Sequence, residues 1–426
     1  MHSFAQLVRK EKTLFSNAGW LFLLQVLNVL LPFVTVPYVT RVFGAERYGI
    51  FSIALNHVTY FQLIVEYGFN LSATKKIVNC KSREEHCDLV SSVVSARIIL
   101  VLICYLVLIG MGVFGAVSDK QLQCATVLFT MLIGIAIQLN WLFQGLQEMK
   151  VITIATAIAR GLSVILILLL IKDSNQLNLY AFLYSITFLC SGILTHYYAF
   201  KQHKIRFHLP DWRQIVCELK DGMPIFLSSA AGKAIGNIGV TVLGLYESAA
   251  IVGAYSAVLK LPLMASLMFA PISQALYPRI NEVRNASNQA AVKLVAKVGT
   301  VVVVLFGMGL LLMTAIRVPL VRLLFGDEYL IAVDTLIPLS VWVLFGIVNN
   351  FLGVQLLIPF GCQSLYSALM LIDCVFALLL NSLFGLLWGA IGVAIAVAVS
   401  EVILTTMLLI ALFKVLKLDS TESTGV

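Results

Sequence analysis

Charged residues are scarce in this chain of 426 residues: Asp, Glu, Lys and Arg together make up 12%, whereas 60% of the residues are hydrophobic. Long polar segments are also absent, because the longest connection between apolar stretches is the segment 201–221. No connection is therefore large enough to fold as a separate catalytic domain. A mean hydropathy of +0.97 exceeds what a water-facing surface tolerates and is typical of proteins embedded in lipid.

The sequence patterns of several enzyme classes are missing as well. The chain has no GxxxxGK[ST] for nucleotide phosphates, no HExxH for zinc hydrolysis and no GxSxG for a serine nucleophile. Its eight cysteines form no CxxC pair and no Cys/His cluster, so free structural thiols are expected rather than metal ligands or disulfides. We therefore expect no catalytic residue, no metal site and no bound cofactor, and we expect the protein not to be an enzyme.

What the chain has instead is about twelve apolar stretches, each long enough to cross about 30 Å of hydrocarbon as a helix. Helices satisfy their own backbone groups in lipid, and continuous apolar runs do not show the alternation of barrel strands. The predicted fold class is therefore all-α, a polytopic membrane protein with no strands. The predicted spans are 14–39, 48–70, 89–115, 122–146, 152–172, 178–200, 222–245, 249–277, 296–316, 334–358, 364–386 and 389–413.

The distribution of cations predicts the orientation. If the N-terminus is cytoplasmic, that side holds 19 of the 29 Lys and Arg, and the opposite side holds only Arg41, Arg47, Lys120, Lys172, Arg317 and Arg322. Cytoplasmic loops carry such an excess, so both termini are predicted to be cytoplasmic. The net charge of +8 is then a signal of topology and of attraction to anionic headgroups, and no nucleic-acid partner is expected.

The chain is predicted to consist of two halves. Residues 1–200 form an N-terminal lobe of six helices, 201–221 a basic cytoplasmic linker, 222–413 a second six-helix lobe and 414–426 a cytoplasmic tail. A weak internal similarity supports this division, because Gly49-Ile-Phe-Ser52 matches Gly253-Ala-Tyr-Ser256. Two parallel halves are a transporter architecture, in which a central cavity handles the substrate.

Four short motifs indicate a family. They are Arg41-Val-Phe-Gly-Ala-Glu-Arg-Tyr-Gly49, Glu66-Tyr-Gly-Phe-Asn-Leu-Ser-Ala-Thr-Lys75, Asn140-Trp-Leu-Phe-Gln-Gly145 and Leu324-Phe-Gly-Asp-Glu-Tyr329. Together they make the chain resemble the Wzx-type O-antigen flippases, in the polysaccharide branch of the multidrug/oligosaccharidyl-lipid/polysaccharide exporter superfamily. The first two motifs are the most specific, and with twelve spans the resemblance covers nearly the whole chain.

This resemblance implies a function. The expected activity is movement of an undecaprenyl-diphosphate-linked O-antigen repeat unit from the cytoplasmic to the periplasmic leaflet of the bacterial inner membrane. Alternating access, driven as an antiporter by a proton or sodium gradient, is the expected mechanism. An O-antigen polymerase and a chain-length regulator of lipopolysaccharide biosynthesis are expected partners, in addition to membrane lipids. The alternative is a cation-coupled exporter of small molecules from the same superfamily, whose cavity should favour acids and aromatics over cations.

Four cations fall within the predicted spans: Arg97, Arg160, Lys233 and Lys260. A charge at the bilayer centre costs at least about 2.5–3.5 kcal/mol on insertion scales, so it usually faces a wet cavity or a partner. A diphosphate needs at least two convergent cations, and we interpret these four as its candidate ligands. The alternative is that each snorkels to the surface or forms a structural ion pair. For Lys233 and Lys260, which lie deepest, the cavity is the favoured interpretation.

Carboxylates and amides complete the predicted site. Asp373 and Glu401 lie near mid-membrane, Glu66 lies toward the cytoplasmic end of its span, and carboxylates at such depth commonly bind protons or sodium. The family resemblance places a cation site among the seventh, eleventh and twelfth spans, which favours Asp373, although a structural pair with Lys233 is equally compatible. Asn28 and Asn56 are candidates for binding sugar, but interhelical packing uses the same residue types.

Overall fold

The structure is a computed structural model that describes the backbone of residues 2–115 and 117–423. Side chains are described for residues 16–17, 19–115, 117–226, 236–285 and 287–417. The described residues are predominantly helical and include no strand, so the predicted all-α fold class is confirmed. They divide into two compact units, Met1–Ala234 and Ile235–Val426. The predicted lobe limits, 1–200 and 222–413, stay a prediction.

Nine helices among the described residues are long and apolar enough to cross a membrane. Two of them are bent at a glycine with non-helical backbone: Gly44 (φ 68°, ψ 174°) inside α1 (His2–Glu66) and Gly389 (φ 58°, ψ −136°) inside α14 (Gln363–Ser423). Positive φ suits glycine, which has no Cβ to clash. Each bent helix holds two predicted spans, so the nine helices hold eleven spans and α9 holds the twelfth.

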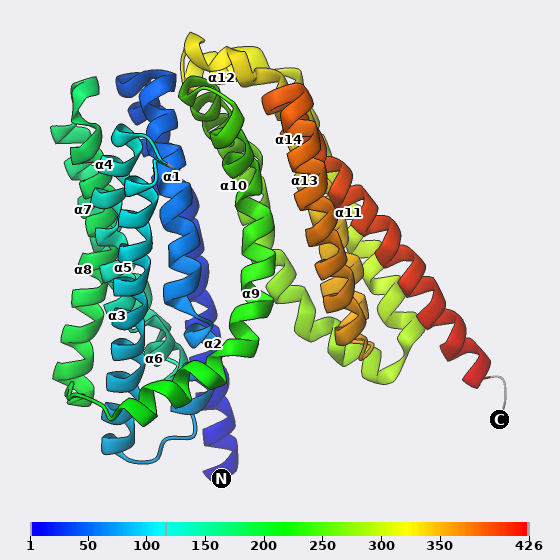
Figure 1. The fold of residues 1–426 in the computed structure, drawn as a ribbon. Helices are drawn as coiled ribbons and strands as arrows, with labels where there is room; N and C mark the ends of the chain where they lie inside the picture. Colours follow the sequence, from blue (N-terminus) through cyan, green and yellow to red (C-terminus); the bar gives the residue numbers. More distant parts are fainter. Residues whose placement is uncertain (1, 116, 424–426) are drawn as a thin grey trace. The chain divides into compact units, whose positions relative to one another are not determined.

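Unit 1 is a bundle whose helices run side by side (Figure 1). After α1 come α2 (Phe69–Ile77), α3 (Arg83–Val113), α4 (Asp119–Leu128), α5 (Thr130–Ile137), α6 (Asn140–Gly145), α7 (Met149–Leu170), η1 (Ser174–Gln176), α8 (Leu177–His203) and the beginning of α9 (Trp212–Tyr246). The predicted span 122–146 is thus three helices instead of one. Its last break lies at Gln138, which has extended backbone, and the neighbouring side chains of Leu139 and Trp141 are fully buried.

The predicted connection 201–221 is shorter than expected, because α8 continues to His203 and α9 already begins at Trp212. The first turns of α9 are amphipathic: Ile215 and Glu218 are buried, whereas Arg213 and Lys220 are exposed. Burial of one face stabilises a helix that its polar composition alone does not predict. This part of the basic segment therefore packs on unit 1.

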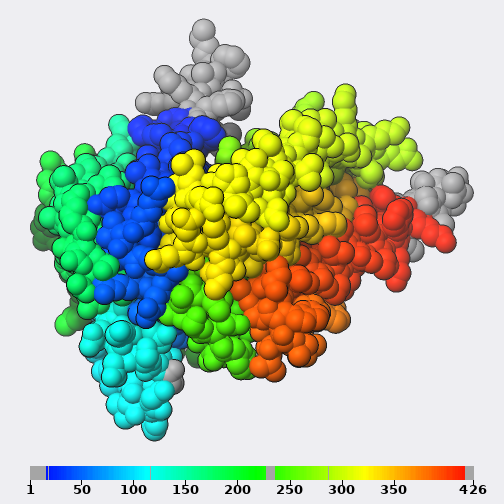
Figure 2. Space-filling view, turned by 90° about the horizontal axis from the view of Figure 1, so that it is seen from above, coloured from blue at the N-terminus to red at the C-terminus, as the bar shows by residue number. Residues whose placement is uncertain are grey.

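Unit 2 contains the rest of the chain. Its elements after α9 are α10 (Ala249–Ala286), α11 (Asn288–Ala315), α12 (Arg317–Leu324), η2 (Asp327–Thr335), α13 (Leu336–Asn349), η3 (Asn350–Leu357) and α14. An apolar core joins α10, α11, α13, η3 and the end of α14 around Phe269 and Phe351. The segment η2 packs against α10, α13 and α14, and together with α12 it lies across one end of this unit (Figures 1 and 2).

Candidate functional site

A buried polar network joins α13 and the two segments of α14 in unit 2. Ser400 donates a hydrogen bond of 2.6 Å to Oδ1 of Asp373, and only 2% of Asp373 is exposed. The next residue, Glu401, accepts a bond of 3.0 Å at Oε1 from the amide of Asn349. Thr405 completes the network by donating to Oδ1 of Asn349 at 2.6 Å. The structure therefore brings together Asp373 and Glu401, two of the three acids that the sequence predicts as ion-coupling residues; Glu66 lies in unit 1.

The two carboxylates lie close enough to repel each other. Trp342 on α13 also reaches the carboxylate of Glu401 with a side-chain hydrogen bond. Hydrogen-bond donors offset part of the cost of burying a carboxylate, but two negative charges remain in a setting with little water. Such a pair is stabilised by a proton or a monovalent cation, which is the chemistry that an ion-coupling site requires.

A second polar cluster joins α10 to η3, and its residue Asn350 directly follows Asn349 of the first network. Ser273 on α10 donates to Oδ1 of Asn350 at 2.8 Å, and the amide of Gln355 donates to the backbone oxygen of Ser273 at 2.9 Å. Gln355 is fully buried, and its Oε1 has no hydrogen-bond partner among the described residues. Asn350 and Gln355 belong to η3, a π-helix, and π-helical turns are frequent at functional sites.

Two predicted cations lack a compensating charge within the part of the chain that the structure describes. Lys260 on α10 and Arg160 on α7 are both half-buried within candidate spans. Among the described residues, neither side chain forms a hydrogen bond or an ion pair. The third cation, Lys233, lies outside the residues whose side chains the structure describes. Because a membrane-embedded cation without a partner is costly, Lys260 and Arg160 have the properties of groups that meet an anionic ligand.

Arg97 has different surroundings. Its guanidinium is buried and donates to the backbone oxygens of Ile135 and Gln138, at 3.3 and 3.1 Å, and to Oδ1 of Asn70 at 2.9 Å. Both carbonyls lie where α5 ends before α6; that of Ile135 also accepts from the backbone N–H of Gln138. A cation at a helix C-terminus interacts favourably with such carbonyls and with the helix dipole. Glu66 adds a compensating charge. These contacts stabilise the break in the helix, and the assignment of Arg97 and Glu66 to transport stays a prediction.

The predicted sugar-binding amides lie on the two segments of α1. Asn28 is half-buried on the first segment, and its Oδ1 has no hydrogen-bond partner among the described residues. Asn56 is buried on the second segment. Buried polar atoms are normally satisfied by protein or water, so Asn28 has capacity for a ligand hydroxyl. Its role in binding sugar stays a prediction.

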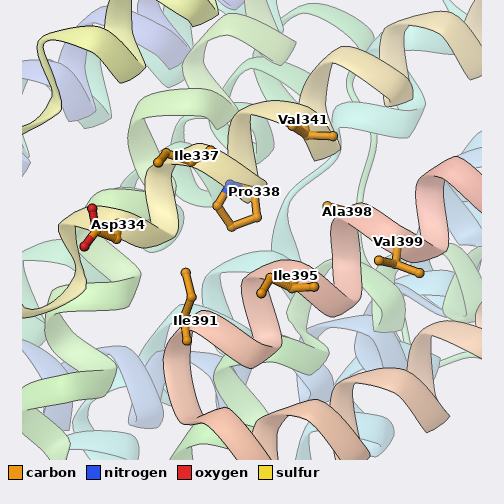
Figure 3. Close-up of a pocket in the computed structure, with 8 residues that line it drawn as sticks. All are labelled: Asp334, Ile337, Pro338, Val341, Ile391, Ile395, Ala398 and Val399. Carbon is orange, nitrogen blue, oxygen red and sulfur yellow. The ribbon is translucent and has the colours of Figure 1, made fainter.

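Unit 2 also carries an apolar groove, with a volume of about 400 Å³, between α13 and the second segment of α14. Pro338, Val341, Ile391 and Ile395 point toward it, and Asp334 lies at one end (Figure 3). The carboxylate of Asp334 is engaged by Nε of Arg317 at 3.0 Å. This lining suits hydrocarbon and offers no group for a phosphate or a sugar.

Outside the predicted spans, an ion cluster holds the start of α9 against α2. The ammonium of Lys76 lies 2.8 Å from Oε1 of Glu218 and 2.7 Å from Oδ2 of Asp221. Burial raises the pKa of the Glu218 carboxyl, and the charge of Lys76 opposes that rise. The ring of Tyr67 stacks on that of Phe226, 4.8 Å away. No local pattern in the sequence indicates this cluster, because its members are distant in the chain.

Two of the residues that donate hydrogen bonds in the network around Asp373 and Glu401 could be found from their spacing in the sequence. Ser400 precedes Glu401 directly, and Thr405 follows it by four residues, which places Thr405 on the same face of the helix. Asn349 has no such signal, because its proximity to Glu401 depends on how α13 packs against α14.

Comparison of structures defines the class of this protein. A lipid II flippase MurJ in an inward closed conformation matches with a TM-score of 0.73 and 14% identity, over 93% of this chain and 87% of that one. A multidrug resistance MATE transporter of the MOP superfamily, facing inward, matches with a TM-score of 0.63 and 14% identity, over 93% and 96% of the two chains. The chain is therefore a multi-pass membrane protein that shares the fold of these proteins.

Sequence comparison identifies the family. Residues 14–284 match the polysaccharide biosynthesis protein family, and the chain belongs to that family. A putative O-antigen transporter of Shigella dysenteriae is 28% identical over 394 residues, which cover 92% of this chain and 98% of the relative. A putative O-antigen transporter of Escherichia coli K12 is 27% identical, over 92% of this chain and 95% of the relative. The resemblance inferred from the four motifs is confirmed.

Proposed function

We propose that this protein moves an undecaprenyl-diphosphate-linked O-antigen repeat unit from the cytoplasmic to the periplasmic leaflet of a bacterial inner membrane. The observation that carries the proposal is that Arg160 in unit 1 and Lys260 in unit 2 are cations within candidate spans with no ion-pair partner among the described residues, in a chain related to O-antigen transporters. A diphosphate supplies the negative charge that these side chains lack. Both termini lie in the cytoplasm in this proposal, as the distribution of cations favours.

Energy for transport comes from a proton or sodium gradient in this proposal. Asp373 and Glu401 bind the coupling ion, and the hydrogen bonds from Ser400 and Asn349 orient their oxygens. Binding and release of a cation change the net charge of a buried network that links α13 with both segments of α14. Such a change in charge can favour one arrangement of these helices over another, which alternating access requires.

Export of a small molecule is the second candidate function, since MATE transporters share the fold. The surroundings of Arg160 and Lys260 argue against a cationic drug as cargo, because like charges repel in a medium of low dielectric constant. The two functions differ in one phenotype: only loss of a flippase removes the surface glycan. We expect the O-antigen polymerase and the chain-length regulator to act on the product that this protein delivers.

The test is the surface glycan of cells that lack the gene and carry variants on a plasmid. Wild type should restore the glycan, whereas Lys260→Ala should lower it at least tenfold at equal protein amount. Lys260→Arg should retain part of the activity, because it keeps the charge. The matched control is Lys120→Ala, which removes an exposed cation at the beginning of α4.

Two outcomes would contradict the proposal. A normal glycan in cells without the gene would exclude a necessary role in its export. A normal glycan with the double variant Arg160→Gln/Lys260→Ala, at native expression, would show that these cations do not bind the diphosphate.

A further inference from the structure

An aromatic ladder runs along the interior face of α8. Tyr180, Tyr184 and Phe188 recur every four residues, and neighbouring ring centres are 6.4 and 6.1 Å apart. Phe51 on the second segment of α1 packs against this ladder, 4.7 Å from Tyr180 and 5.7 Å from Tyr184. Aromatic pairs at such separations hold one another in fixed orientations. The ring of Tyr184 is therefore set in place by its neighbours.

Tyr184 lies on the side of α8 that is turned away from lipid. The exposed apolar side of α8 carries Tyr197, which is 60% exposed, and Phe200, which is 59% exposed. Tyr184 precedes Tyr197 by 13 residues, which places the two on opposite sides of a helix with 3.6 residues per turn. Even so, Tyr184 and Phe188 are only half-buried, whereas Tyr180 is buried. Part of the Tyr184 ring is thus accessible from the interior side.

Arg160 lies on α7, the helix that packs against α8. Arg160 lies two residues from both Ile158 and Leu162, which belong to the exposed apolar side of α7. Residues two apart point to nearly opposite sides of a helix, so Arg160 is turned away from lipid. Ser163, three residues after Arg160 on α7, donates a hydrogen bond of 2.7 Å to the backbone oxygen of Leu183, the residue before Tyr184 on α8. A half-buried cation and a half-buried tyrosine therefore lie at the same level of two helices that pack together, both turned away from the exposed apolar sides.

We propose that Tyr184 is a sugar-binding platform, on which the sugar bonded directly to the diphosphate stacks while Arg160 binds the diphosphate itself. This inference rests on the proposed function and adds the residue that recognises the saccharide. The chemistry of the cargo supports it, because the first sugar of a diphosphate-linked saccharide is bonded directly to the phosphate. A ring beside a phosphate-binding cation therefore meets that sugar. Aromatic rings offer an apolar face to the C–H groups of a sugar, and the Tyr184 hydroxyl adds a hydrogen-bonding group.

The test compares two probes on the full-length protein in lipid nanodiscs. One probe is the lipid-linked oligosaccharide extracted from cells that lack this protein, and the other is undecaprenyl diphosphate without sugar. Tyr184→Leu should bind the first probe about tenfold more weakly and the second as well as wild type does. Tyr184→Phe, which keeps the ring, should retain most of the affinity. Arg160→Gln should weaken the binding of both probes.

The matched control is Tyr197→Leu, which makes the same change on the opposite side of the same helix and should alter neither affinity. If Tyr184→Leu does not accumulate as folded protein, Phe188→Leu removes the next half-buried ring of the ladder and should also weaken only the first probe. Equal affinities of Tyr184→Leu and wild type for the oligosaccharide probe would overturn the proposal. An equal loss of affinity for both probes in Tyr184→Leu would also overturn the proposal, because the ring would then act only through Arg160 and not on the sugar. Failure of wild type to bind either probe would overturn the proposed function itself.

Discussion

Asp373→Asn tests whether the acid network couples transport to an ion gradient. The amide has nearly the shape of the carboxylate, and its oxygen can still accept the 2.6 Å hydrogen bond from Ser400. The substitution therefore removes the charge with little loss of packing. A structural role for Asp373 predicts nearly normal transport, whereas a coupling role predicts that the gradient no longer drives it.

The expected effect can be estimated from the charge that is moved. One elementary charge that crosses 100 mV supplies about 2.3 kcal/mol, which corresponds to about 50-fold in the ratio of lipid-linked sugar between the two leaflets. Asp373→Asn should lose this factor. Ser400→Ala keeps the charge and removes one hydrogen bond, which inside a membrane contributes about 0.6 kcal/mol on average. It should therefore slow transport a few-fold and keep the dependence on the gradient.

The assay is exposure of lipid-linked sugar on reconstituted vesicles, measured with and without imposed proton and sodium gradients. Wild type should respond to one gradient, Asp373→Asn to none, and Glu401→Gln should be impaired less than Asp373→Asn. Binding of the lipid-linked sugar should survive in both acid variants. Equal rates under all conditions, in wild type and in Asp373→Asn alike, would refute the reasoning and assign Asp373 a structural role.

Two further predictions concern topology and stability. In a cysteine-free chain, Ser82→Cys and Asn288→Cys should react only with a reagent on the cytoplasmic side. Asp119→Cys should react only with a reagent outside. Labelling of Ser82→Cys from outside would reverse the orientation. Lys76→Glu leaves the buried Glu218 beside a like charge and should destabilise the protein by about 2 kcal/mol in thermal unfolding. The exchange Lys76→Glu/Glu218→Lys should restore part of that loss, and no recovery would mean that the ion cluster does not hold α9 on α2.

Composition and hydropathy were sufficient to predict the helical, membrane-embedded class and the approximate positions of the spans. The physical reason is that lipid leaves a backbone few alternatives: a long apolar stretch must be helical to satisfy its hydrogen bonds. Short motifs were sufficient to predict the family. The three helices within 122–146 were not predictable in this way, because the break at Gln138 is stabilised by Arg97, a residue that is distant in the chain.

The sequence alone determined which charges lie within the spans, since their depth follows from counting residues along each helix. It did not determine which of these charges have partners. That depends on the helix faces that meet, and only the tertiary structure decided it: Arg97 is engaged by carbonyl oxygens, whereas Arg160 forms no hydrogen bond or ion pair among the described residues. Likewise, Asp373 and Glu401 were separate candidates until the packing of the two segments of α14 placed Ser400, the neighbour of Glu401, against Asp373. Contacts between residues far apart in the chain depend on packing, which a single sequence does not specify.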